Sequence, residues 1–140
     1  MSNNLITLDG YNLEAELRGE EISFCSFVPD SKEGQAILFK AMNNPTNRIS
    51  DMINKQICVK DVYCEVVQVT NAQGEVSMQP RTVLIDMNGD SYQCVSTGIF
   101  SAVKKLCRVF GMPTWEEGVT VEVKQVKSKE RQLLTLDVVI

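Results

Sequence analysis

The sequence predicts a mainly β protein: a five-stranded barrel with one helix between its third and fourth strands, preceded by a strand-and-helix extension. Two observations predict this architecture. From Gln56 onward, hydrophobic periodicity gives the order strand, strand, strand, helix, strand, strand. The long first strand also changes phase near Asp61, as a strand that contributes to both sides of a barrel must. This is the connectivity of the OB-fold. The alternative is a mixed α+β sandwich with the N-terminal helices packed on one sheet face.

Residues 1–55 form the N-terminal extension. The segment "EEISFCSF" predicts a strand, and "DSKEGQAILFKAMNN" predicts a helix with Asp30 as N-cap and Glu33 at the third helical position. Pro45 ends this helix, because the residue before proline disfavours helical geometry. A short second helix is predicted over "NRISDMINK". We expect this extension to pack on a barrel of residues 56–140, within one domain spanning residues 1–140.

The first barrel strand is predicted over "QICVKDVYCEVVQVT". Ile57 and Val59 lie on one phase, whereas Val62 and Cys64 lie on the other. A β-bulge or sharp bend reconciles the two phases. A polar loop, "NAQGEVSMQ", follows.

The stretch "DMNGDSYQC" has two incompatible interpretations. Asp86, Asn88 and Asp90 alternate like the first ligands of a calcium loop. Such a loop needs glycine at its sixth position and glutamate at its twelfth, but Ser91 and Thr97 stand there. The flanking segments "TVLID" and "SYQCVS" favour strands, and Asn-Gly is the preferred pair of a type I′ turn. The stretch therefore predicts the hairpin between the second and third barrel strands, and no metal site.

The last part of the chain contains the barrel helix and the final hairpin. Thr97 is predicted to cap the helix "GIFSAVKKLCRVF", which ends before Gly111. Its apolar stripe consists of Ile99, Val103, Leu106 and Phe110. The strands "VTVEVKQV" and "QLLTLDVVI" are then predicted to pair through the charged turn "KSKER".

Composition excludes several classes of function. The chain has no histidine, which removes Ser-His-Asp and Cys-His catalysis, and it has no phosphate-binding loop or dinucleotide fingerprint. No run of about eighteen apolar residues predicts a membrane span, and the first residues do not resemble a secretory signal. We therefore expect a cytoplasmic protein that is not an enzyme and needs no cofactor or metal.

The five cysteines do not suggest disulfides. Their number is odd and no C-x-x-C pair occurs, so we interpret them as buried thiols of a reducing compartment. A four-cysteine zinc site is the alternative, but it lacks the usual closely spaced pairs. The cysteines are Cys25, Cys58, Cys64, Cys94 and Cys107.

Positive charge gathers in the part that would hold the binding surface of the barrel. The chain has a net charge of −4, but residues 81–140 carry eight Lys/Arg against seven Asp/Glu. Single-stranded nucleic acid needs cations that follow the phosphates and aromatic rings on which bases stack. The candidate binding residues are Tyr63, Arg81, Tyr92, Lys124, Lys127, Lys129 and Arg131.

Each candidate also has a purely structural interpretation. Lysines in a hairpin tip often protect a sheet edge, and the two tyrosines favour strands whether or not they bind. Lys104, Lys105 and Arg108 fit the outer face of an amphipathic helix. Trp115 is better explained as a loop anchor under the barrel than as a stacking platform. The overall acidity, with a pI near 4.9, argues against a sequence-specific duplex reader.

Three long segments resemble a known family. They are "LITLDGYNLEAELRGEEISFCSFVPDSKEGQAILFKAMNNPT", "VLIDMNGDSYQCVSTGIFSAVKKLCRVFG" and "GVTVEVKQV". Together they resemble the small single-stranded DNA-binding proteins encoded by bacteriophages and mobile elements of Gram-positive bacteria. The resemblance implies a protein that coats single-stranded DNA without sequence preference, protecting it during replication or recombination in the cytoplasm of a bacterial host.

The resemblance leaves the partners open. Cellular single-strand binders of bacteria end in an acidic tail that recruits other enzymes, whereas this chain ends "LLTLDVVI", so we do not expect recruitment by that route. Single-stranded DNA is the expected partner, with a homodimer or higher assembly and replication or recombination proteins as further candidates. The alternative is an acidic protein-interaction or inhibitor module that acts through residues 30–55.

Overall fold

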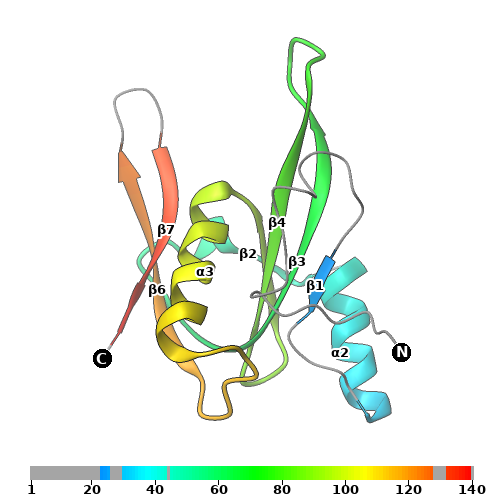
Figure 1. The fold of residues 1–140 in the computed structure, drawn as a ribbon, viewed down its shortest axis with the longest axis vertical. Coiled ribbons are helices and arrows are strands. Elements are labelled where there is room, and N and C mark those ends of the chain that lie inside the picture. Colours follow the sequence, from blue (N-terminus) through cyan, green and yellow to red (C-terminus); the bar gives the residue numbers. More distant parts are fainter. Residues whose placement is uncertain (1–22, 26–29, 44, 128–131, 140) are drawn as a thin grey trace.

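The computed structural model describes residues 23–25, 30–43, 45–127 and 132–139. They form one strongly curled sheet with helices on both sides of it (Figure 1). In chain order the elements are β1 (Ser23–Cys25), α2 (Lys32–Asn43), β2 (Asn47–Arg48), the 3-10 helix η1 (Ile49–Met52), β3 (Gln56–Thr70), β4 (Val76–Asp86), β5 (Ser91–Val95), α3 (Thr97–Phe110), β6 (Val119–Lys127) and β7 (Gln132–Val138).

The predicted OB-like connectivity is confirmed. The sheet has the strand order β2-β5-β4-β3-β6-β7, with β1 paired to β3, and α3 lies in the chain between β5 and β6. Among the strands that the structure describes, β2 pairs with β5 in parallel and the other ladders are antiparallel. Within the described residues, no ladder joins β5 to β7, so the barrel is left open along this seam.

The predicted break in the first barrel strand is also confirmed. The register of β3 against β4 shifts between Val59 and Asp61. Before the shift, residues 56–59 of β3 pair with β6, and after it residues 63–65 pair with β1. The bulge thus allows β3 to pair with β6 on one side of the bend and with β1 on the other.

Two hairpins of this sheet end in the same kind of turn. Asn71 and Asp86 each accept backbone N–H bonds on one side-chain oxygen, from the second and fourth residues after them, at 2.8–3.0 Å. Positive φ occurs at Gly74 and Gly89 and not at Asn88. The hairpin prediction at Asp86 was therefore right, but the type I′ turn was wrong. The turn is a three-residue loop that closes on a left-handed glycine.

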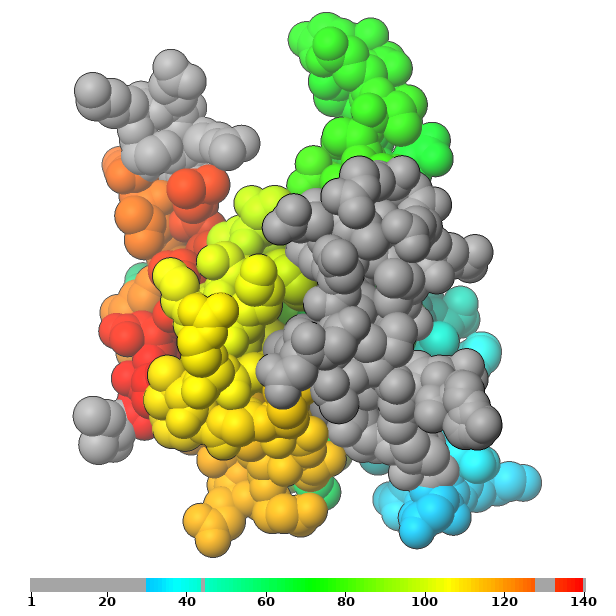
Figure 2. Space-filling view, viewed as in Figure 1, coloured from blue at the N-terminus to red at the C-terminus, as the bar shows by residue number. Residues whose placement is uncertain are grey.

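The predicted loop after β3 is shorter than expected. Thr70 pairs with Val76, so β4 begins inside the segment predicted as "NAQGEVSMQ". The strands β3 and β4 consequently form a long hairpin that projects from the body of the molecule, shown in green in Figure 2. The cross-strand ladder extends these strands although few of their outer residues are buried.

The helices α2 and α3 each begin at a serine beside the residue predicted to cap them. The Ser31 hydroxyl accepts a bond from the N–H of Gly34 at 3.0 Å, one residue after Asp30. The Ser96 hydroxyl accepts from the N–H of Ile99 at 3.2 Å, and Ser96 has extended backbone geometry. An N-cap residue needs such geometry, which excludes Thr97 because it lies within α3.

The two faces of the sheet carry separate hydrophobic clusters. The larger, inner cluster lies between the curled sheet and α3 and includes Val62, Leu84, Ile99 and Val103. The smaller, outer cluster lies under α2, where Ala41 packs with Tyr63, Val83 and Ile85. The N-terminal helix therefore covers the outer face of strands β3 and β4.

Candidate nucleic-acid interface

The two candidate tyrosines lie on opposite faces of the sheet. Tyr63 belongs to the outer cluster under α2, is 3% exposed and donates a hydrogen bond to Glu65 at 2.9 Å. Tyr92 packs against the inner cluster and donates to Asp86 Oδ2 at 2.9 Å. Burial, followed by this bond to Asp86, raises the pKa of Tyr92 to about 12. The tyrosines do not come together as one stacking surface.

Arg81 is a structural cation in this fold. Its guanidinium donates to Glu65 Oε2 at 2.9 Å and to Gln93 Oε1 at 3.0 Å. It also reaches the carbonyl oxygens of Ala41 and Met42 at 3.5 and 3.4 Å, near the end of α2. Because Arg81 is 8% exposed, these contacts connect β4 to β3, β5 and α2 and leave little of the guanidinium for phosphate.

Of the candidate cations of the last hairpin, the structure describes Lys124, which is partly exposed, and Lys127, which is exposed. Lys127 ends β6 in an exposed position. Lys124 lies 2.8 Å from Glu122, and the hydrogen bond to this carboxylate raises the pKa of Lys124. Lys129 and Arg131 lie outside the described residues. Of the two described cations of this hairpin, Lys124 is therefore paired with Glu122.

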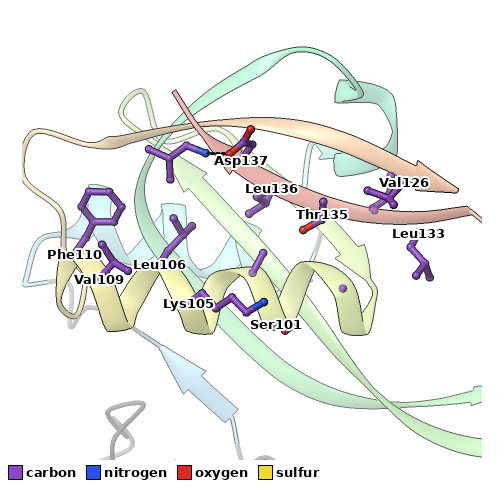
Figure 3. Close-up of a pocket in the computed structure, with 14 residues that line it drawn as sticks. Ser101, Lys105, Leu106, Val109, Phe110, Val126, Leu133, Thr135, Leu136 and Asp137 are labelled. Carbon is purple, nitrogen blue, oxygen red and sulfur yellow. Dashed lines mark hydrogen bonds between the residues drawn. The ribbon is translucent and has the colours of Figure 1, made fainter. Parts of the chain in front are cut away.

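An open groove that the sequence patterns did not predict lies between α3 and the β6–β7 hairpin. It has a volume of about 670 Å³, and its lining is mainly apolar. Figure 3 shows α3 on one side and β7 on the other, with Leu106 and Leu136 between them. Val109 and Phe110, at the end of α3, are 76% and 45% exposed. A signal was present in the sequence, because "QLLTLDVVI" supplies more apolar residues than one buried strand face requires.

A second hollow continues this groove along the open seam of the barrel. It has a volume of about 310 Å³ and lies between the ends of β4 and β5 and strand β7. Both hollows are lined by Leu133 and Leu134. Beside this open seam α3 and β7 lie close together, since a Cβ added at Gly98 would collide with the carbonyl oxygen of Leu134.

The exposed side of α3 is cationic. Lys104, Lys105 and Arg108 are all exposed, and α3 contains no acidic residue. The Lys104 ammonium lies 5.5 Å from the centre of the Phe100 ring, and Lys105 lines the groove. A cationic helix beside an apolar groove can accept an anionic chain that also carries apolar groups.

Comparison with known proteins identifies a family for this chain. Residues 18–139 match the model of a family described as phage single-stranded DNA-binding protein. The chain belongs to this family. No curated protein and no solved structure shows significant similarity to it. Binding of single-stranded DNA is the function that membership supports, and it does not favour the alternative of an acidic inhibitor module.

Other expectations for this phage single-stranded DNA-binding protein concern its cysteines and Trp115. Cys58, Cys64, Cys94 and Cys107 are free thiols, of which Cys64 and Cys107 are buried. Burial raises the pKa of Cys107 to about 11. Trp115 is buried, and its indole N–H donates to the carbonyl of Gly111 at 3.0 Å, as expected of a loop anchor.

The described part of this family member offers neither a metal cluster nor a membrane span. Among its His, Cys, Asp and Glu side chains, no three gather in a way that could hold a metal ion. Its helices are also too short or too polar to cross a bilayer.

Proposed function

We propose that this protein binds single-stranded DNA without sequence preference and covers it during replication or recombination of a phage or mobile element. The observation that carries the proposal is the family match over residues 18–139. In this proposal the protein is not an enzyme, requires no cofactor and acts in the cytoplasm of the bacterial host. It folds and binds as one domain, with a homodimer or higher assembly and replication proteins as further partners.

The arrangement of the hairpins supports this function. Members of the OB-fold commonly bind oligonucleotides between the loop that joins the first two strands and the loop that joins the last two. Here the corresponding hairpins, β3–β4 and β6–β7, project to the same side of the molecule, with α3 between them (Figure 1). A single strand lying between them would meet Lys124 and Lys127 on one side.

The cations of the last hairpin supply the electrostatic part of binding. We propose that Lys124, Lys127, Lys129 and Arg131 contact the phosphates. Such contacts carry no sequence information, and they would therefore give binding without sequence preference. Tyr92 remains in the proposed site as a half-buried residue. Tyr63 and Arg81 can contribute only if α2 moves away from the outer face of the sheet.

The direct test is fluorescence anisotropy of a labelled thirty-base oligo-dT across a series of salt concentrations, with the equivalent duplex as comparison. We expect tight binding to the single strand, weakening with a log–log slope of about −0.7 for each neutralised phosphate. Mixed-sequence single strands should compete and duplex should not. Absence of binding to oligo-dT at low salt would refute the proposal.

A matched pair of variants tests the location of binding. Replacing Lys124, Lys127, Lys129 and Arg131 together by glutamine should weaken binding and flatten the dependence on salt. The control replaces Lys32, Lys40, Arg48 and Lys55, four exposed cations of the N-terminal part, in the same way. Both variants change the net charge equally, so a specific loss in the first variant identifies the last hairpin as part of the interface.

A further inference from the structure

The groove between α3 and β7 has the features of a binding site that the strand arrangement alone does not predict. Its volume of about 670 Å³ lies within the range of about 300–1,000 Å³ typical of small-ligand sites. Apolar side chains from two elements form its floor, with Leu106 and Val109 from α3 and Leu133 and Leu136 from β7. The open seam of the barrel creates this groove, since β7 is the last strand of the sheet path.

The charges around the groove favour an anionic occupant. Lys105 lines it directly, and Lys104 and Arg108 are exposed elsewhere on the same helix. The anion among the lining residues is Asp137, whose carboxylate accepts a hydrogen bond from the N–H of Val138 at 3.0 Å. The chain has a net charge of −4, but α3 carries three cations, which makes the exposed side of α3 suited to phosphates.

OB-folds commonly bind nucleic acid on the face of their second and third strands, here β4 and β5, and the β4 part of this face is covered by α2. On the outer face of β3 and β4, Tyr63, Val83 and Ile85 pack against Ala41 of α2. Arg81 of the same face is engaged with Glu65 and with carbonyl oxygens of α2. Bases therefore cannot stack on the β3 and β4 part of the outer face while α2 is in place.

We infer that the groove between α3 and β7 is a base-binding subsite for single-stranded DNA, in which bases lie on the apolar floor while the cations of α3 hold the adjacent phosphates. This inference rests on the proposed function and adds a location to it. A groove of this kind accepts any base, because apolar contact with the faces of the bases does not distinguish their hydrogen-bonding edges. It also explains why exposed apolar residues stand next to cations at the end of α3.

The test uses the full chain and two probes, a labelled thirty-base oligo-dT and a strand of thirty abasic sites with the same phosphate backbone. Wild-type protein should bind oligo-dT more tightly than the abasic strand. Leu133→Ser and Val109→Ser should weaken binding to oligo-dT about five- to tenfold and reduce that preference. Their dependence on salt should not change, since no charge is removed.

The rim of the groove is tested by charge. Lys105→Ala should weaken binding to both probes and reduce the salt slope by about 0.7. The matched controls lie on α2, where Phe39 is 65% exposed and Lys40 is exposed. Phe39→Ser and Lys40→Ala should leave both affinities within about twofold of wild type.

The outcomes separate this inference from the proposed function. If wild type binds oligo-dT but the groove variants bind both probes as wild type does, the inference is overturned and the function stands. If wild type does not bind oligo-dT, the function fails and the inference with it. Thermal melting of each variant identifies losses caused by unfolding, and Val109, at 76% exposed, offers a substitution that the fold tolerates.

Discussion

Arg81 Nη1 lies 2.9 Å from Glu65 Oε2, and the same guanidinium reaches carbonyl oxygens at the end of α2. The pair connects neighbouring strands, since Glu65 and Arg81 face each other in the β3–β4 ladder. The sequence presents Arg81 as one of several cations near a binding surface. In the structure Arg81 connects α2 to the outer face of the sheet by hydrogen bonds to carbonyl oxygens of this helix.

We therefore expect Arg81→Ala to act mainly on stability. Removing one partner of a buried ion pair costs about 3–5 kcal/mol, and the cost here should be about 2–3 kcal/mol, because Glu65 retains some exposure to water. Urea unfolding measures this loss, with Arg108→Ala as a control for an exposed cation. If Arg81→Ala retained full stability but lost affinity for oligo-dT, the guanidinium would have to be assigned to DNA binding instead.

Gly98→Ala should destabilise the contact between α3 and β7. The added Cβ would meet the backbone carbonyl of Leu134, which cannot rotate away as a side chain can. Overpacking costs about 1–3 kcal/mol and outweighs the gain of up to about 1 kcal/mol from the better helix propensity of alanine. Thermal unfolding measures the difference, and Ser101→Ala, an exposed position on the same helix, should change little. A stability gain in Gly98→Ala would contradict the close approach.

The two related turns give a matched comparison. Asp86 is 9% exposed and its carboxylate accepts two backbone N–H bonds and the Tyr92 hydroxyl, whereas Asn71 makes the same backbone bonds in an exposed turn. Asp86→Ala should cost about 2–4 kcal/mol and Asn71→Ala about 1 kcal/mol or less, because water replaces lost bonds at the exposed site. Denaturant unfolding of both variants tests this order. Equal losses would show that burial and Tyr92 add nothing at the Asp86 turn.

The stabilising effect of Tyr92 should disappear at alkaline pH. Its pKa is raised from 10.0 to about 12, first by burial and then by Asp86. A raised pKa in the folded state means that the stability is fully present below pH 10 and is lost as pH rises through about 12. Wild type should therefore exceed Tyr92→Phe in melting temperature at pH 8, and this difference should shrink between pH 10 and pH 12. A difference that stays constant over this range would contradict the raised pKa.

The order of elements could be predicted because it depends on local patterns. The alternation around Asp61 predicted the bulge, the Asn-Gly pair predicted a hairpin, and Gly111 predicted the end of α3, and all three are confirmed. The errors were local as well. Ser31 and Ser96 compete with Asp30 and Thr97 as caps, and only the backbone geometry decides which residue lies outside the helix.

The binding surface could not be predicted in the same way. Strand parity places Tyr63 and Tyr92 on opposite faces, but a sequence does not reveal which face a distant helix will cover. The groove beside α3 depends on the seam between β5 and β7, and therefore on how far the sheet curls.

The sequence by itself determined the family, the succession of strands and the helix that interrupts them, because these depend on periodicity and on residues near one another in the chain. The tertiary structure decided which side chains remain available to DNA. Arg81 and Tyr63 are buried against α2, whereas Lys105 and Val109 line an open groove. The physical reason is that exposure results from packing between elements far apart in the sequence, and no local pattern records it.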